Sequence, residues 1–348
     1  MTGNEMRRIA RRVALPGVCI VSALWWNAGK GPGAPREAGA VIACDSRLTV
    51  KQPRMLAFGL ENPRGVAYDA KAKAVWVVEG KRRLLVKYLV DEGRYEELPK
   101  EQYPCPDGPC ETTDQRGVDA TDCAPFVADH VRMQFVRRTE RRRAGCTMEY
   151  DPWYAAAGPS GLVLAEVGGV KTLFTTEDRP WTEPPGPASA LPDSVDYSRW
   201  RDKQEPRPFG EVRGQAAGGV VTTISQSVRH PSGIALAPGQ DKIYVTESDA
   251  DGTRWRVFEN NGGAWQDAGV LGAAAAGEAA IPAFRGMAAC GELVFAGGPD
   301  GLYVFLSSGA ALGRVAIDDV TGVSCGESKK GKRMVYFAAG HALYGAKY

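Results

Sequence analysis

The stretch Gly65-Val66-Ala67-Tyr68, followed after a polar turn by Ala74-Val75-Trp76-Val77-Val78, sets the pattern from which the fold is predicted. Its Val, Tyr and Trp residues favour strands. The same unit recurs at Gly233-Ile234-Ala235-Leu236, which leads to Lys242-Ile243-Tyr244-Val245. In all, the glycine that opens the unit occurs six times, at Gly65, Gly117, Gly161, Gly233, Gly286 and Gly322. A recurring unit of strands without helical periodicity predicts an all-β fold, a six-bladed β-propeller.

Length, charge and composition fit one repeat domain. The 348 residues carry 43 basic and 41 acidic side chains, so no global positive field points to nucleic acid. We expect the propeller to occupy residues 41–348, with a strand within Asp45–Leu60 closing the ring. A polar, proline-rich insertion (residues 177–213) interrupts blade 3, and blade 4 is expected over residues 218–262.

Residues 1–40 have a different character, that of a targeting or anchor segment. Four arginines precede an apolar run (residues 13–26), and Ala38-Gly39-Ala40 offers a small-residue cleavage site. This order is typical of a signal peptide and predicts an extracytoplasmic, secretory location. Two alternatives stay open: a mitochondrial presequence, and a retained membrane anchor that associates with the membrane through residues 13–26.

The eight cysteines favour disulfides in an oxidising compartment. Cys105 and Cys110 bracket a Pro/Gly turn, and Cys123 and Cys146 flank one expected hairpin. A zinc site is the rival interpretation, but no Cys-x-x-Cys pair exists and the chain has only three histidines.

The stretch Pro231-Ser-Gly-Ile-Ala-Leu-Ala-Pro-Gly-Gln-Asp-Lys-Ile-Tyr-Val-Thr-Glu-Ser248 resembles the central signature of the SMP-30/gluconolactonase/LRE-like family. Pro299-Asp-Gly-Leu-Tyr-Val-Phe305 and the ending Ala342-Leu-Tyr344 continue the likeness, which covers about residues 45–348. The resemblance implies a six-bladed propeller whose central cavity holds one divalent metal and hydrolyses lactones or related esters.

The metal-ligand positions depart from the family pattern. The family takes its ligands from the residue before the glycine, as Glu, Asn, Asn and Asp, where this chain has Arg64, Ser160, Ser232 and Arg285. Hard divalent cations need carboxylate and carbonyl oxygens, and guanidiniums repel them. We therefore expect a degenerate site with no metal and no other cofactor. The alternative is one divalent cation such as calcium.

Six residues are expected to line the axis: Arg64, Arg116, Ser160, Ser232, Arg285 and Thr321. Three arginines with hydroxyls between them predict a cationic cup that binds a small anion or acidic ligand. In the competing interpretation each arginine pairs with an acidic neighbour, such as Asp119 or Glu247, and closes the channel.

Metal-free catalysis has weak candidates. Ser160 and Ser232 are possible nucleophiles, and His230 and His130 possible bases, but neither serine has a Gly-x-Ser-x-Gly elbow. We therefore expect a non-catalytic binding or structural subunit of an assembly. Its protein contacts would be the insertion 177–213, the arginine-rich hairpin 137–143 and the N-terminal arm, although a short basic run is also typical of a solvated turn. The alternative is a lactone or ester hydrolase.

Overall fold

The computed structural model describes the chain over the following ranges: residues 39–80, 84–97, 102–105, 108–111, 115–121, 124–129, 134–141, 147–155, 159–177, 209–216, 221–249, 252–271 and 284–348. Within this described part, the regular structure is entirely β and no helix occurs. The predicted all-β class is confirmed.

Six sheets of four or five strands account for most of the described residues. Sheet 1 contains β3 (Pro63–Asp69), β4 (Ala74–Glu79), β5 (Leu84–Leu89) and β6 (Arg94–Glu97). Sheet 2 contains β9 (Gln115–Thr121), β10 (Ala124–Asp129), β11 (Gln134–Arg141) and β12 (Thr147–Ala155). Sheet 3 contains β13 (Pro159–Val167), β14 (Val170–Glu177), β15 (Phe209–Ala216) and β16 (Val221–Arg229).

The remaining sheets follow in chain order, and two of them recruit a strand from near the N-terminus. Sheet 4 contains β17 (Ile234–Leu236), β18 (Lys242–Asp249), β19 (Gly252–Asn261) and β20 (Ala264–Leu271). Sheet 5 contains β21 (Gly286–Cys290), β22 (Leu293–Gly298), β23 (Gly301–Leu306), β24 (Ala311–Ala316) and β1 (Ala40–Ala43). Sheet 6 contains β25 (Val320–Glu327), β26 (Arg333–Ala339), β27 (Ala342–Lys347) and β2 (Arg54–Phe58). A separate hairpin is formed by β7 (Gln102–Cys105) and β8 (Gly108–Glu111).

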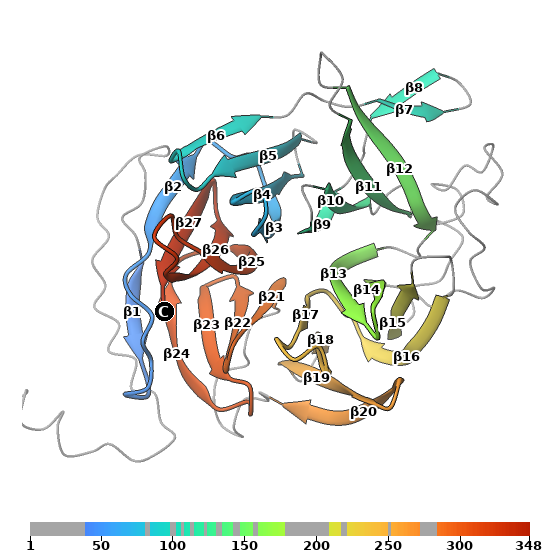
Figure 1. Ribbon diagram of the computed structural model, residues 1–348. Helices are drawn as coiled ribbons and strands as arrows, with labels where there is room; N and C mark the ends of the chain where they lie inside the picture. The colour runs from blue at the N-terminus through green and yellow to red at the C-terminus, as the bar shows by residue number, and fades with distance from the viewer. Residues whose placement is uncertain are drawn as a thin grey trace, which may run out of the picture.

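The sheets surround a central axis as a β-propeller, with the first strand of each sheet innermost (Figure 1). These inner strands contact one another in a closed cycle: β3 with β9, β9 with β13, β13 with β17, β17 with β21, β21 with β25, and β25 with β3. The ring therefore closes through contacts between neighbouring inner strands.

The recurring glycine is required because adjacent inner strands approach too closely for a side chain. A Cβ built on Gly322 would lie 2.8 Å from the backbone nitrogen of Val66, in the next sheet. A Cβ on Gly286 would lie 2.9 Å from Cα of Gly322, and one on Gly161 would lie 2.4 Å from the carbonyl oxygen of Ser232. Real Cβ atoms do not sit this close to backbone atoms, so the glycine repeat reflects the packing of one sheet on the next.

Two strands near the N-terminus bind the last two sheets. β2 pairs with β27, so the strand predicted within residues 45–60 does join the final sheet, although only residues 54–58 form it. β1, which the sequence pattern did not predict, pairs with the outer strand β24 of sheet 5. Ala40, expected at the end of the leader, is the first residue of that strand.

Two predicted boundaries are wrong. Residues 221–229 were assigned to blade 4, but they form β16, which pairs with β15 as the outer strand of sheet 3. The insertion is also shorter than the range 177–213, because Glu177 ends β14 and pairs with Glu211 of β15. The residues between these two strands, 178–208, lie outside the described part of the chain.

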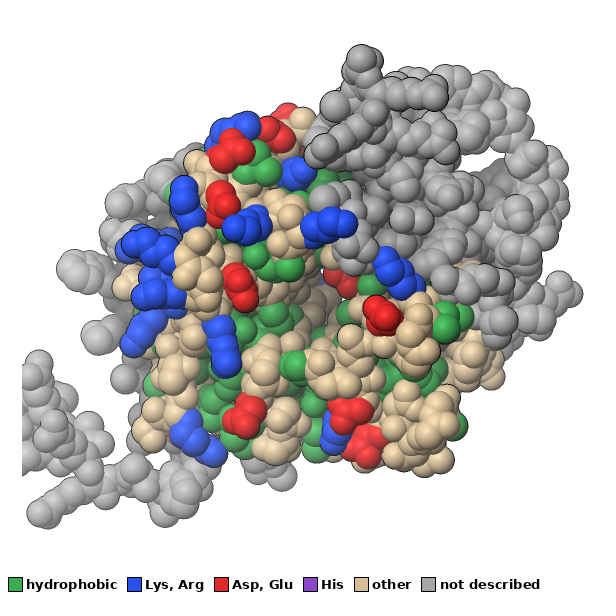
Figure 2. Space-filling view, in the orientation of Figure 1, with side chains coloured by type: hydrophobic (Ala, Val, Ile, Leu, Met, Phe, Trp, Pro, Cys, Tyr) green, Lys and Arg blue, Asp and Glu red, His purple; other side chains and the backbone are tan. Residues whose placement is uncertain are grey.

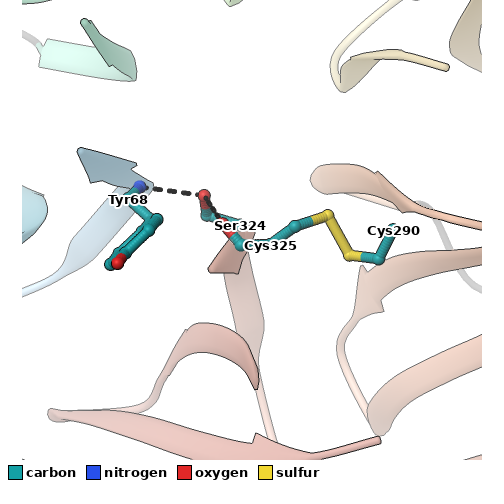
Figure 3. The surroundings of a disulfide bond; sticks show 4 residues. All are labelled: Tyr68, Cys290, Ser324 and Cys325. Carbon is teal, nitrogen blue, oxygen red and sulfur yellow. Dashed lines mark hydrogen bonds between the residues drawn. A yellow bond between two sulfur atoms is a disulfide. The ribbon is translucent and has the colours of Figure 1, made fainter. Parts of the chain in front are cut away.

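Sheets 5, 6 and 1 are also tied together by side chains (Figure 3). A disulfide joins Cys290 on β21 to Cys325 on β25. On the other side of β25, the backbone N–H of Tyr68 in sheet 1 donates to Ser324 Oγ at 2.9 Å. Asp119 occupies the equivalent position in sheet 2, and its Oδ2 accepts from the backbone N–H of Leu164 in sheet 3 at 2.7 Å. The predicted use of cysteine for a disulfide is thus confirmed for one pair.

Several predictions fall on residues that the structure does not describe, among them the leader and the side chains of Cys105, Cys110, Cys123 and Cys146. The proposed membrane segment 13–26 is among them. Within the described residues, no helix is long and apolar enough to cross a membrane.

Candidate functional site

The six predicted axial residues occupy equivalent places in the ring. Arg64, Arg116, Ser160 and Thr321 lie in the inner strands β3, β9, β13 and β25, whereas Ser232 and Arg285 directly precede β17 and β21. Because the inner strands contact their neighbours in a cycle, these positions recur at the start of successive inner strands around the ring. The side chain of Arg116 is outside the described part of the chain, so the contacts given below are those of the other residues.

Ser232 uses its hydroxyl to join sheet 4 to the segment that enters sheet 5. Its Oγ donates to the carbonyl oxygen of Phe284 at 2.6 Å and lies 2.8 Å from Thr246 Oγ1. A hydroxyl that donates to a backbone carbonyl keeps its proton, which is the opposite of what a nucleophile needs. The geometry therefore describes Ser232 as a bridge between sheets.

Other axial hydroxyls make the same kind of bridge. Thr321 Oγ1 donates to the carbonyl oxygen of Pro63, which fastens sheet 6 to sheet 1. In sheet 3, Thr176 Oγ1 accepts from the Gly161 N–H at 2.8 Å and donates to the Ser232 carbonyl oxygen at 3.0 Å. Thr176 and Thr246 were not predicted as site residues, since nothing local in the sequence marks a hydroxyl whose partner lies in a neighbouring sheet.

The two described axial arginines each have a polar neighbour that occupies some of their N–H donors. Arg285 forms an ion pair with Asp319, in which Nη1 meets Oδ1, and both side chains are about half exposed (52% and 48%). Arg64 lies beside Asn62, whose amide oxygen, when it faces the guanidinium, accepts from Nε and Nη2 at 3.2 Å. Figure 2 shows basic and acidic side chains interspersed around the centre of the ring.

His230 occupies a strained turn position. Its φ is +41°, and the corresponding residues Asn62 and Asp319, which also lie just before an axial residue, have φ of +55° and +58°. Asn, Asp and His are the non-glycine residues that most often adopt this left-handed region. The exposed His230 is thus explained by the turn it makes. His130, the other candidate base, lies outside the described residues.

Buried glutamates at the ends of second strands hold these turns in place. Glu79 Oε1 accepts from the Glu61 N–H at 2.9 Å, and Glu247 Oε1 accepts from the Arg229 N–H at 3.0 Å. Each acceptor is almost completely buried, with at most 1% of its surface exposed. These glutamates therefore fix the backbone just before Pro63 and Pro231, where the chain turns toward the axis.

Glu247 is also paired with two arginines of its own sheet. Arg254 Nε lies 3.1 Å from Oε2, and Arg256 Nη2 lies 3.1 Å from Oε1. Burial acts to raise the pKa of Glu247, but the hydrogen bonds from the Arg229 backbone and from both guanidiniums outweigh it, so the pKa falls below its ordinary value. Of the two acids considered as partners of axial arginines, Glu247 is thus held by arginines elsewhere.

Asp119, the other acid expected to pair with an axial arginine, is half-buried between sheets 2 and 3. Its two carboxylate oxygens accept from the backbone N–H groups of Ala120, at 2.8 Å, and Leu164, at 2.7 Å. Burial raises the pKa of this carboxyl to about 6, against the lowering effect of the two hydrogen bonds. Asp119 therefore serves the junction between two sheets.

The donor chemistry at the axis does not suit a divalent cation. The four positions that hold metal ligands in the resembled family carry two guanidiniums and two hydroxyls, and the hydroxyl of Ser232 is engaged by backbone and side-chain partners. Within the described residues, no group of three or more His, Cys, Asp or Glu side chains could hold a metal ion. A hard cation prefers carboxylate and carbonyl oxygens, and the side chains at these four positions have neither.

Comparison with known proteins places the fold. No family model matches the chain, and no curated protein matches its sequence. Among solved structures, a putative gluconolactonase superposes with a TM-score of 0.61 at 17% identity, covering 88% of this chain and 97% of its own.

Two further structures are similar. A gluconolactonase from Xanthomonas campestris gives a TM-score of 0.60 at 14% identity, with 90% of this chain and 98% of its own covered. Regucalcin from Agrobacterium tumefaciens, a calcium-binding protein, gives 0.54 at 13% identity, with 84% and 92% covered. These superpositions establish a shared propeller fold of the gluconolactonase and regucalcin type. At such low sequence identity they say nothing about chemistry.

Proposed function

We propose that this chain is a six-bladed propeller of the SMP-30/gluconolactonase type with a degenerate metal site, and that it works as a non-catalytic binding or structural subunit of an assembly. The observation that carries the proposal is that two axial hydroxyls hydrogen-bond to backbone carbonyl oxygens outside their own sheets. Ser232 donates to the Phe284 carbonyl oxygen in the segment that enters sheet 5, and Thr321 donates to the Pro63 carbonyl oxygen in sheet 1. Hydroxyl groups that hold the ring together in this way are poorly suited to bind a metal or to give up their proton to a base.

The axial arginines supply the binding element of the proposal. Arg285 is half exposed, and its guanidinium has five N–H donors, of which Nη1 meets Asp319. Arg64 lies in β3, the first strand of sheet 1, which contacts the strand β25 that contains Thr321. A small anion that displaces or extends the Asp319 contact would receive charge-assisted hydrogen bonds from this side of the axis.

The assembly and its location are inferred from outside the axis. The proposed contact elements remain the insertion, the arginine-rich hairpin and the N-terminal arm. Of the hairpin, residues 137–141 belong to strand β11. The Cys290–Cys325 disulfide supports an oxidising, extracytoplasmic or membrane-anchored setting over the mitochondrial alternative.

The second candidate is a lactone or ester hydrolase, which the likeness to two gluconolactonase structures favours. It would act with a divalent cation such as calcium, or without metal through Ser232 or Ser160. The hydroxyl contacts of Ser232 argue against the metal-free route.

Hydrolysis of gluconolactone by the purified full-length chain tests these alternatives. With and without added calcium, zinc or manganese, we expect no rate above the uncatalysed background. A metal-dependent rate would overturn the non-catalytic proposal, and a metal-independent rate that Ser232→Ala abolishes would establish serine catalysis.

Anion binding is tested separately by isothermal titration with gluconate. Arg285→Gln should weaken binding roughly tenfold, the equivalent of one charge-assisted contact. Arg314→Gln is the matched control, because Arg314 also pairs with an aspartate, Asp300, but on the outer part of sheet 5. Equal effects of the two substitutions, or no binding by the wild type, would refute an axial anion site.

A further inference from the structure

A cavity of about 610 Å³ lies away from the axis, where sheet 6 meets sheet 1. Its walls come from three places: the segment leading into β2 with β2 itself, the strands β26 and β27 with the turn before β26, and the end of β5. The volume is in the range of pockets that enclose small organic molecules. Nothing in the predicted axial site uses this cavity.

Four cationic side chains line the cavity, and no carboxylate does among the residues that the structure describes. The four are Lys51, Arg54, Lys329 and Lys347. The backbone N–H of Lys51 donates to the carbonyl oxygen of Lys347 at 2.8 Å, which holds these two lysines side by side. In the described part of the chain, neither they nor Arg54 form an ion pair.

This concentration of charge is local. The whole chain carries a formal net charge of only +2. Figure 2 shows Lys and Arg side chains gathered on the side of the molecule where β2 and the C-terminus lie in Figure 1. The turn before β26 adds the exposed Lys330 and Lys332. Like charges held together without counter-charges create a positive potential that an anion relieves.

The rest of the cavity lining is mostly apolar, with Gln52 and Ser328 as its uncharged polar residues. Leu56, Val90 and Met334 contribute aliphatic surface, and Tyr88 and Tyr336 contribute largely buried rings. The Tyr336 hydroxyl donates to the carbonyl oxygen of Glu327 at 2.7 Å. Its ring also stacks on Tyr68, with centroids 5.7 Å apart. The wall is therefore preorganised to receive an apolar group.

We propose that this cavity binds a small organic anion. Lys51, Arg54 and Lys347 hold its phosphate or carboxylate, and its apolar or aromatic body packs against the apolar wall that includes Leu56 and Met334. Guanidinium and ammonium groups recognise such oxyanions through charge-assisted hydrogen bonds. The apolar surface of the cavity supplies the part of the affinity that a bare ion cannot obtain. The site is independent of the proposed axial function.

Isothermal titration with three probes separates the two halves of the proposal. Phenyl phosphate carries both the anionic and the aromatic part, inorganic phosphate carries only the first, and phenol only the second. We expect phenyl phosphate to bind at least roughly tenfold more tightly than either fragment. Absence of phenyl phosphate binding, or equal binding of inorganic phosphate, would overturn the proposal.

A pair of matched double variants locates the site. Arg54→Gln with Lys347→Gln removes two charges from the cavity wall, and Lys330→Gln with Lys332→Gln removes two from the adjacent exposed turn. The first pair should weaken phenyl phosphate binding roughly tenfold or more, and the second by less than about twofold. Equal weakening would show a diffuse electrostatic patch in place of a cavity site. Thermal unfolding of both variants checks that each is folded.

Discussion

Replacing Gly322 with alanine is expected to destabilise the ring at the junction of sheets 6 and 1. The new Cβ would lie 2.8 Å from the Val66 nitrogen, 2.9 Å from the Gly65 carbonyl carbon and 3.0 Å from the Arg64 carbonyl oxygen. All three atoms belong to the backbone of β3, so no side chain can rotate away. The strands cannot separate easily either, because Thr321 Oγ1 is bonded to the Pro63 carbonyl oxygen next to the contact.

The size of the effect follows from two opposing contributions. Overpacking that forces a backbone shift costs about 1–3 kcal/mol. The substitution also removes freedom from the unfolded chain, which returns about 0.4–1 kcal/mol when the native φ suits alanine. We expect a net loss of about 1–2 kcal/mol in the free energy of unfolding, measured by urea denaturation. The midpoint should fall with little change in slope.

Gly239→Ala is the matched control. Gly239 lies in the turn between β17 and β18, and the first contact of its built Cβ is the terminal Oδ1 of Asp241, at 2.9 Å. Neither glycine has a positive φ that alanine would avoid. The control should change stability by less than about 0.5 kcal/mol, since a flexible carboxylate can move. If Gly322→Ala is as stable as the wild type, close packing of inner strands does not explain the glycine repeat.

Two further predictions concern the joins between sheets. Burial raises the pKa of Asp119 from 3.8 to about 6 in the folded protein, so its contribution to stability is fully present below about pH 4 and is lost as the pH rises to about 6. Asp119→Asn should remove this fall, which amounts to at most about 3 kcal/mol, from the pH profile of urea denaturation; parallel profiles for the variant and the wild type would contradict the assignment. The Cys290–Cys325 disulfide closes a loop with a sequence separation of 35, which corresponds to a contribution of about 4 kcal/mol to stability. The double variant Cys290→Ala with Cys325→Ala should lose most of this contribution in urea denaturation, and so should the reduced wild type, whereas unchanged stability of both would show that β21 and β25 are held sufficiently by other contacts.

The fold could be predicted because its main constraint repeats along the chain. Gly161, Gly286 and Gly322 occupy the same place in three inner strands, and each lies too close to the neighbouring backbone for a side chain, so the constraint leaves a repeated pattern in the sequence. The boundary between sheets 3 and 4 was misplaced because Val221–Arg229 is an outer strand with several exposed polar residues, and the sequence does not say which partner it pairs with. The short β1 was missed since it begins at Ala40, the last residue of the predicted leader, and has only four residues.

The repeated turns before the inner strands could be located from the sequence, but the chemical roles of the residues predicted there could not. Ser232 and His230 are close in sequence, which suggested a nucleophile and a base. The left-handed backbone at His230 and the Ser232 contact with Phe284 depend on the turn geometry and on the neighbouring sheet. The peripheral cavity gave no sequence signal, because its cationic residues come from segments as distant as Lys51 and Lys347.

The pairing of β2 with β27 sets the order in which the molecule can be completed during synthesis. Arg54 meets Gly345 in this ladder, so a strand made among the first residues of the ring waits for one made among the last. Until β27 (Ala342–Lys347) leaves the ribosome, β2 presents an unpaired edge to other nascent chains. The time between the translation of these two strands is therefore the interval in which a growing chain is most exposed to aggregation, and slowing elongation would lengthen it.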